Sequence, residues 1–315
     1  MKKLLVIGSA VADVIIRIDC LPKTGEDVHI KKQSLAIGGC AYLAGNILRH
    51  FGIPILQCSA IGGGMYGDYI YRSFLEKNIP VLVHLPEEKN GCCYCIVEAD
   101  GERTFIVDHG IEYSFHESYL TGIDPEEIDS VYVCGLELEE SCGEEIIHYL
   151  EKHREYSIYF APGPRIMKLQ QDRIEKILDL HPILHLNAEE SMTYTHTGSV
   201  ELAARVLYER TEAPVIITMG AEGSLCFDGT MYKASPVPAS VVDTIGAGDS
   251  HIGAVMACRK LGYSYPESIE IANCISSAVV SQSGGELTEE GYQAIFKENR
   301  TRTLKTDRET ETFEV

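Results

Sequence analysis

Short β-rich runs alternate with amphipathic segments along most of this 315-residue chain. The alternation is typical of a mostly parallel sheet with helices on both faces, because each helix returns the chain to the same end of the sheet. Two segments, 13–34 and 92–109, break the pattern: each resembles a hairpin with no helix to cover it, and the second turns at Asp100-Gly101. The sequence therefore predicts a three-layer α/β/α core and, standing off it, one small β-sheet.

The expected elements define a division of the chain. Expected core strands are 4–7, 54–59, 130–134, 157–160, 183–186 and 215–218, and expected helices are 41–51, 68–78, 143–153 and 200–209. The core would then consist of residues 1–12, 35–91 and 110–300, and the small sheet of 13–34 and 92–109. Residues 301–315 are polar without apolar periodicity, so we expect a flexible tail.

Charge and apolar length exclude several partners. The chain has 27 Lys and Arg against 47 Asp and Glu, a formal charge of −20. Such a charge repels nucleic acids and anionic membranes, so we expect neither as a partner. No apolar run approaches the roughly 20 residues that span a bilayer. The start of the chain imitates a signal peptide, but Gly8 and Ser9 interrupt the apolar run, which favours a buried first strand over 3–7.

The cysteines predict a cytoplasmic protein. There are 11 of them, an odd number, scattered and mostly within apolar runs, as expected for reduced core thiols. Residues 92–95 contain one C-x-x-C, but no second pair with zinc spacing follows it. We therefore interpret 92–95 as a strand and not as a metal site.

Residues 241–250, VVDTIGAGDS, carry the strongest chemical signal. A β-branched run, expected to be a strand, leads into a small-residue loop and then a helix, so the backbone N–H groups of 246–248 can face an anion. Asp249 beside them can accept the proton of an attacking hydroxyl. The structural alternative is a strand-to-helix turn in which Asp249 is a helix cap.

Residues 243–249 resemble the D-T-x-G-A-G-D signature of the ribokinase-like (PfkB) carbohydrate and nucleoside kinases. Further segments resemble this family's motifs in the same order along nearly the whole chain. They are Gly8-Ser9 with Asp13, residues 21–26, Gly38-Gly39 followed by a helix and Phe51-Gly52, residues 100–104, Asn187 with Glu190, and residues 218–224. The resemblance implies a ribokinase-like fold in which the small sheet is a lid over the substrate.

The resemblance also implies two cofactors, ATP and Mg²⁺, and a K⁺ ion that some members of the family bind. It further implies a role for each of several residues. Asp249 would be the base, with Gly246, Ala247 and Gly248 as the anion hole. Asp13, Gly38 and Gly39 would bind the substrate, as would Leu43 at its edge. The nucleotide residues would be Asn187, Thr218, Gly220, Gly223 and Asn273; Glu190 would hold Mg²⁺ through water, and Asp243 and Ile245 would hold K⁺.

Departures from the family pattern concern the substrate. Leu43 stands where many members carry an Asn that contacts the sugar, and a leucine side chain cannot form a hydrogen bond. Cys93, Tyr94 and Cys95 make one lid face less polar than a sugar site prefers. The substrate is therefore a sugar or a nucleoside, pseudouridine-type compounds included. An exposed lid edge also suggests a homodimer that pairs through the lid.

Two other classes of protein compete with a kinase. Residues 62–67, GGGMYG, satisfy G-x-G-x-x-G and suggest a dinucleotide-dependent oxidoreductase, although the match is not in the first β–α turn. The second competing class is a non-catalytic regulator that binds a ligand. Such a protein need not keep Asp249 and the glycines of the anion hole, and because this sequence has both, catalysis is favoured. No G-x-x-x-x-G-K-[ST] occurs, which excludes a P-loop kinase.

Overall fold

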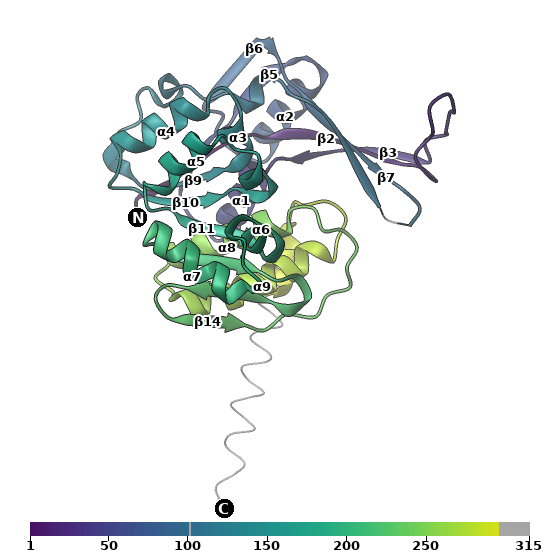
Figure 1. The fold of residues 1–315 in the computed structure, drawn as a ribbon. Helices are drawn as coiled ribbons and strands as arrows, with labels where there is room; N and C mark the ends of the chain where they lie inside the picture. Colours follow the sequence, from purple (N-terminus) through teal and green to yellow (C-terminus); the bar gives the residue numbers. More distant parts are fainter. Residues whose placement is uncertain (101, 296–315) are drawn as a thin grey trace, which may run out of the picture.

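The structure, a computed structural model, describes residues 1–100 and 102–295 (Figure 1). Its main sheet has eight strands, of which seven run in one direction and one, β13, runs antiparallel to both of its neighbours. Their spatial order is β14 (Met231–Ala234), β13 (Ser224–Phe227), β12 (Val215–Thr218), β11 (Ile183–Asn187), β10 (Ser157–Ala161), β9 (Ile128–Cys134), β1 (Lys3–Ile7) and β4 (Ile55–Cys58). The predicted mostly parallel sheet is confirmed.

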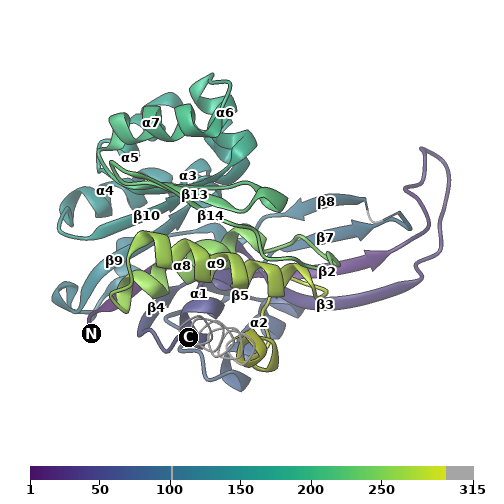
Figure 2. The same ribbon diagram turned by 90° about the horizontal axis from the view of Figure 1, so that it is seen from below.

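Helices cover both faces of this sheet (Figure 2). On one face lie α1 (Cys40–His50), α8 (Ala247–Lys260) and α9 (Tyr265–Val280), and on the other α3 (Gly135–Glu139), α4 (Gly143–Lys152), α5 (Gln171–Leu178), α6 (Ala188–Thr195) and α7 (Val200–Thr211). Successive side chains of a strand point to opposite faces, so β1 places Leu5 and Ile7 in one core and Leu4 and Val6 in the other. The three layers are confirmed.

The expected elements lie where the sequence places them, with ends that differ by up to four residues at the start of α2 (Gly64–Glu76). The segment 3–7 is β1, a strand between β9 and β4 whose four apolar residues are buried, and so the strand interpretation is confirmed. Short 3₁₀ helices occur at Ile111–Tyr113, Glu117–Leu120, Pro125–Glu127, Gly163–Met167 and Gly220–Glu222. No helix within the described ranges is long and apolar enough to cross a membrane.

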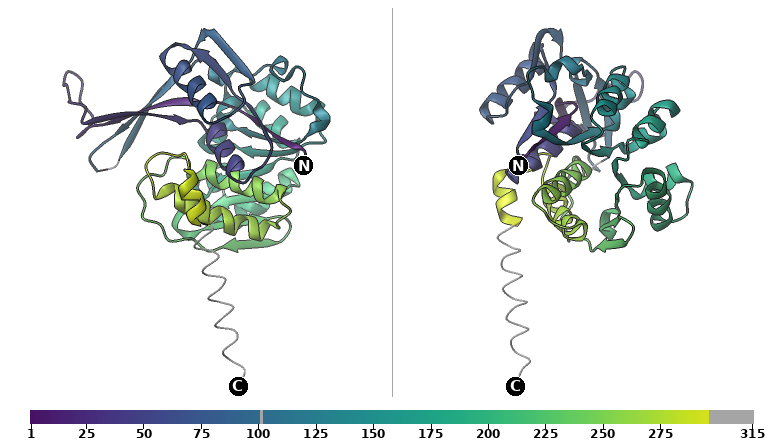
Figure 3. Two further views of the ribbon diagram at one scale, coloured as in Figure 1. Left: turned by 180° about the vertical axis from the view of Figure 1, so that it is seen from behind. Right: turned by 90° about the vertical axis from the view of Figure 1, so that its left-hand side faces the viewer.

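A separate four-stranded sheet projects from the core (Figure 3). Its order is β3 (Lys32–Gly38), β2 (Val11–Arg17), β7 (Cys92–Val97) and β8 (Arg103–Asp108). The two off-sheet segments predicted from the sequence thus join in one sheet, through parallel pairing of β2 with β7. The first hairpin is longer than 13–34. Residues near its base, among them Val14 and Ile37, are buried against α1 and α2 and anchor the sheet to the core.

The glycines of 62–67 have a packing role that the oxidoreductase hypothesis did not foresee. They close β5 (Ala60–Gly63) and open α2. Within the part of the chain that the structure describes, β5 pairs only with β6 (Val83–Lys89), in a two-stranded sheet apart from the main one. A Cβ on Gly63 would lie 2.0 Å from the Pro86 carbonyl oxygen, and one on Gly67 would lie 2.1 Å from that of Gly62. A dinucleotide fingerprint belongs at the end of a main-sheet strand, so this hypothesis was wrong.

The strand expected at Val241 and Val242 is also absent, since both residues lie in a loop and are 65% and 55% exposed. Their backbone is held instead by hydrogen bonds from Val242 N and Asp243 N to the Val280 carbonyl oxygen, at 2.8 and 3.2 Å. β-branched residues favour a strand only where a neighbouring strand can pair with them, and no strand among residues 1–100 and 102–295 pairs with this loop. The tail expected at 301–315 lies outside the described residues.

Candidate active site

The D-T-x-G-A-G-D loop ends in the first turn of α8, a helix of 14 residues. Gly246 caps the helix with φ of 74°, a left-handed conformation that favours glycine. Within the described ranges, the N–H groups of Gly246, Gly248 and Asp249 have no hydrogen-bond acceptor, whereas Ala247 N donates to the Thr244 carbonyl oxygen at 3.3 Å. Free N–H groups at the positive end of a helix dipole suit an anion. In the predicted anion hole, the N–H group of Ala247 is therefore engaged, and that of Asp249 is a free donor in its place.

Asp249 stands beside these donors, half-buried, with its carboxyl group in an acidic setting. Burial raises its pKa to about 6; the Cys40 thiol hydrogen-bonded to it lowers the pKa, and the Glu137 carboxylate raises it. Glu137, at the carboxyl end of β9, accepts hydrogen bonds from Ser9 N and from the Cys134 thiol. A carboxylate that is mostly ionised at neutral pH yet titrates near it is well matched to accept a proton.

The di-glycine motif brings Asp13 against the start of α1. A Cβ on Gly38 would lie 2.0 Å from Asp13 Oδ2, and one on Gly39, where φ is 95°, would lie 2.5 Å from the Ser9 carbonyl oxygen. Cys40 follows directly and reaches Asp249. Burial raises the pKa of Asp13 to about 7, and nearby Asp243 adds to the rise. The residues expected to hold the substrate therefore lie next to the expected base, and Cys40 forms the contact between them.

Leu43 lies under the glycine loop. It is 3% exposed, and Cβ atoms built on Gly246 and Gly285 would lie 3.0 and 2.8 Å from its Cδ1. The side chain thus packs against the loop from below, and its contact with the substrate stays a prediction.

Arg103 of β8 connects the lid to the catalytic loop. Its Nη1 lies 3.0 Å from Asp243 Oδ1 and 3.4 Å from Thr244 Oγ1, and both partners of the ion pair are mostly buried. The same Asp243 carboxylate accepts hydrogen bonds from Ile245 N at 2.8 Å and Gly284 N at 3.1 Å. Arg103 Nε is buried and has no partner among the described residues, so one donor beside the loop is free for a ligand.

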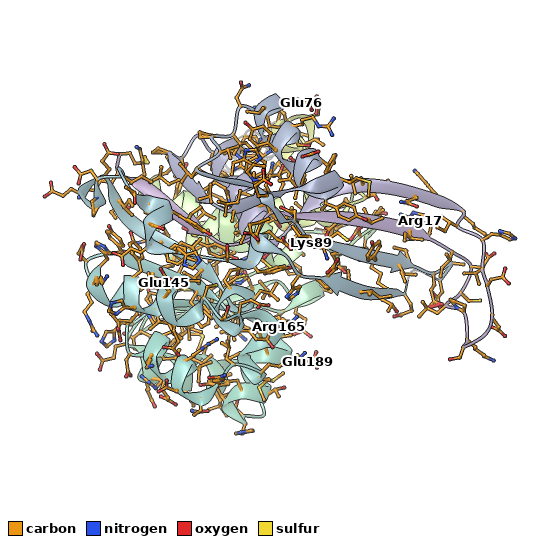
Figure 4. All side chains as sticks on the ribbon, turned by 90° about the horizontal axis from the view of Figure 1, so that it is seen from above. Arg17, Glu76, Lys89, Glu145, Arg165 and Glu189 are labelled. Atoms are coloured by element: carbon orange, nitrogen blue, oxygen red, sulfur yellow. The ribbon has the colours of Figure 1, made fainter. Side chains whose placement is uncertain are left out.

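The nucleotide-side residues gather at the carboxyl ends of β11 and β12, where Asn187 pairs in register with Thr218. Asn187 and Glu190 form a reciprocal cap of α6: Asn187 Oδ1 accepts from Glu190 N at 2.8 Å, and Glu190 Oε2 accepts from Asn187 N at 2.9 Å. Burial raises the pKa of Glu190. Figure 4 shows neighbouring Glu189 on the side of the core from which the lid projects.

Two glycines and one asparagine complete the predicted nucleotide set. Gly220 and Gly223 have φ of 57° and 92°, and a Cβ on Gly223 would lie 2.1 Å from the Ala234 carbonyl oxygen, so the turn after β12 requires glycine there. Asn273, on α9, lies beside this turn, since its amide also donates to the Ala234 carbonyl oxygen at 3.4 Å. Its amide donates to the Ser235 carbonyl oxygen at 3.0 Å, and its oxygen lies 3.2 Å from Nε2 of the buried His251. Both ends of Asn273 are thus engaged within the protein.

Sequence reasoning assigned no role to Arg103, Cys40 or Glu137, all of which the structure places at the site. Arg103 and Cys40 were visible within the motifs 100–104 and 38–43, but which partner each would meet was not. Glu137 had a weaker signal, an acidic residue three positions beyond a buried strand, at the carboxyl edge where α/β proteins place their sites.

Comparisons with known proteins agree with this geometry. Residues 1–290 match the family described as "pfkB family carbohydrate kinase". The "Uncharacterized sugar kinase YegV" of Escherichia coli is 30% identical over 290 residues, 90% of each chain, and a "Nucleoside kinase" of Methanothermobacter thermautotrophicus is 23% identical over 287 residues, 90% of this chain and 91% of that one. A crystal structure of a putative Ribokinase II from E. coli with ATP and Mg²⁺ aligns with a TM-score of 0.77 at 18% identity, covering 95% of this chain and 100% of that one. The chain therefore belongs to the PfkB family of carbohydrate kinases, phosphotransferases with an alcohol acceptor, and has the ribokinase-like fold with its β-sheet lid.

Proposed function

We propose that this protein transfers the γ-phosphoryl group of ATP to a hydroxyl of a sugar or nucleoside, with Asp249 as the base. The observation that carries the proposal is the Asp249 carboxyl group at the start of α8, next to N–H groups of Gly246, Gly248 and Asp249 that have no acceptor within the described ranges. The start of α8 thus offers both a proton acceptor and hydrogen-bond donors for the negative charge of the phosphoryl group.

The mechanism follows from this placement. Asp13 accepts hydrogen bonds from substrate hydroxyls and orients the acceptor, and Asp249 takes the proton of the attacking hydroxyl as the bond to phosphorus forms. The N–H groups of the glycine loop stabilise the charge that collects on the transferred phosphoryl oxygens. The lid, whose strand β2 carries Asp13, excludes water, which would otherwise compete as acceptor.

Asn187 and Glu190 fit the proposed Mg²⁺ site in donor chemistry. Mg²⁺ prefers oxygen ligands and keeps several waters, and one oxygen of each side chain is already engaged in the cap of α6. The pair would therefore hold the ion through its waters. Bound Mg²⁺ would neutralise phosphate charge. Thr218, Gly220 and Gly223 border the same edge and would line the nucleotide site.

The acceptor is best identified by direct survey. ADP release from ATP and Mg²⁺ should be measured across sugars and nucleosides, C-nucleosides such as pseudouridine included, with Asp249→Asn as the control. We expect turnover with one compound class that is lost in the control. A folded chain that binds ATP but releases no ADP with any acceptor would favour the non-catalytic regulator.

The predicted K⁺ site at Asp243 and Ile245 has the least support from the contacts of its residues. Asp243 was expected to help hold K⁺, but both of its oxygens receive N–H donors and the Arg103 guanidinium already supplies a positive charge. We therefore expect turnover to change less than about twofold when K⁺ is replaced by tetramethylammonium, and Arg103→Gln to lower turnover and become activated by K⁺. Strong K⁺ activation of the unaltered protein would contradict this role of Arg103. The homodimer through the lid and the cytoplasmic location stay predictions.

A further inference from the structure

The lid carries a cluster of metal-ligating side chains on the face that looks toward the catalytic loop. Asp13 of β2 and Cys93 and Cys95 of β7 each direct one ligand atom to a common point, and these atoms all lie within 4.8 Å of one another. The two Sγ atoms are 3.7 Å apart. Proton transfer by Asp249 uses neither thiol, so their convergence on Asp13 is a feature that the phosphotransfer mechanism leaves unexplained.

Strand register produces this convergence. Asp13 pairs with Cys93 in the parallel β2–β7 ladder, so the two side chains project from the same face, and Cys95, two residues on, projects from it as well. Cys92 pairs with Ala12, and both are buried in the apolar cluster on the other face. The relevant spacing is therefore C-x-C on one face, and the C-x-x-C of 92–95 has its two thiols on opposite faces, as the strand interpretation requires.

The separation of the thiols matches a tetrahedral metal. A Zn–S bond is about 2.3 Å, so two thiolates on one tetrahedral zinc ion lie roughly 3.8 Å apart. The observed 3.7 Å needs almost no movement of either side chain. Three protein ligands leave the fourth position of the tetrahedron open to water or another ligand, as in zinc sites that exchange a ligand.

We propose that Asp13, Cys93 and Cys95 bind one Zn²⁺ ion on the inner face of the lid. Binding forms two Zn–S bonds and one Zn–O bond and releases the thiol protons to solvent. Thiolates select Zn²⁺ over Mg²⁺, which prefers oxygen, so the Mg²⁺ that accompanies ATP does not compete for the site. Cys93 is partly exposed, which gives the ion a route of entry.

The site has a consequence for turnover, which rests on the proposed role of Asp13 in substrate binding. Zinc that engages the Asp13 carboxylate removes the acceptor of the substrate hydroxyls and fills the space beside it. We therefore expect Zn²⁺ to inhibit competitively with the acceptor and not with ATP.

Direct binding is the decisive test because it does not require turnover. Co²⁺ should be titrated into the reduced protein as a spectroscopic substitute for zinc, followed by displacement with Zn²⁺ in competition with a chromogenic chelator. We expect one ion per chain with a thiolate-to-cobalt charge-transfer band. The Cys93→Ser/Cys95→Ser double variant should bind more than roughly 100-fold more weakly, since even outer partners of a metal site contribute about 10- to 100-fold.

Two matched controls test the geometry. Cys92→Ser removes a thiol on the opposite face of the same strand and Cys20→Ser an exposed one, and both should retain the band and the affinity. The single variants Cys93→Ser and Cys95→Ser are measured beside the double variant, with circular dichroism to verify folding. Absence of the band in the unaltered protein, or its persistence in the double variant, would overturn the site. Binding without any effect on turnover would retain the zinc site and instead contradict the substrate role of Asp13.

Discussion

Replacing Asp249 with Asn is expected to leave the fold intact and to lower kcat by about 10²-fold or more, the usual weight of a general base. The amide keeps the shape of the side chain but cannot accept a proton in this pH range. Steady-state ADP release measures the effect, and thermal unfolding verifies the fold. Asp68→Asn, at an exposed position of α2, is the matched control and should behave as the unaltered protein.

The pH profile supplies a second readout of the same residue. Because the pKa of Asp249 is raised to about 6, the carboxylate form is lost as pH falls through 6, and kcat should fall with it. Above pH 7 the group is ionised and kcat should level off. A variant Asp249→Asn with near-normal turnover, or a profile with no acidic limb, would exclude Asp249 as the base.

Replacing Asp13 with Asn is expected to weaken acceptor binding and to stabilise the folded protein at pH 8. The amide offers one acceptor oxygen in place of two and adds donors, so KM for the acceptor should rise by about tenfold or more, as when one charged hydrogen bond is lost. The stability effect has another origin. The pKa of Asp13 is about 7 in the folded chain against an ordinary 3.8, so the folded state holds this proton more tightly than the unfolded state does.

The sign of the pH dependence follows from that difference. Asp13 costs no stability at pH values below about 4, costs progressively more as pH rises from 4 to 7, and exerts its full cost above 7. One pKa unit corresponds to about 1.4 kcal/mol, so the full cost is about 2–4 kcal/mol after allowance for partial solvent access. Urea unfolding at pH 8 and pH 5 should show Asp13→Asn more stable than the unaltered chain, with a smaller gap at pH 5. Equal stability at both values would mean that the Asp13 carboxylate is not desolvated.

A loss of stability from a buried charge is common where a protein keeps that charge for function. Asp13 and Asp249 are both carboxyls whose pKa burial raises, and Glu137, further inside, shares that environment. Removing either charge would stabilise the folded state and remove a group that the proposed reaction needs, a conflict between stability and activity that many active sites show.

Patterns local in the sequence determined much of the fold. The alternation of apolar runs and amphipathic segments predicted the layered core, since each strand and helix must bury its own apolar face. The motif 243–249 identified the glycine loop and its acid because the requirement for small residues before a helix N-terminus is written within a few positions. The strand expected at Val241 and Val242 failed for want of a neighbour: both residues have strand propensity, but no described strand pairs with them.

Contacts between distant segments were decided only by the tertiary structure. The sequence does not show that Arg103 forms an ion pair with Asp243, 140 positions away. Nor does it show that Leu43 packs under Gly246, or that the side-chain oxygen of Asn273 is engaged by His251. Nor does it show that β2 and β7 pair in parallel with Asp13 opposite Cys93, which is what turns a C-x-C on one strand into a three-ligand cluster. Local sequence determines which face of a strand or helix is apolar and where the chain can turn. Which side chains then meet depends on register and packing, properties that belong to pairs of segments and are fixed only when the whole chain has folded.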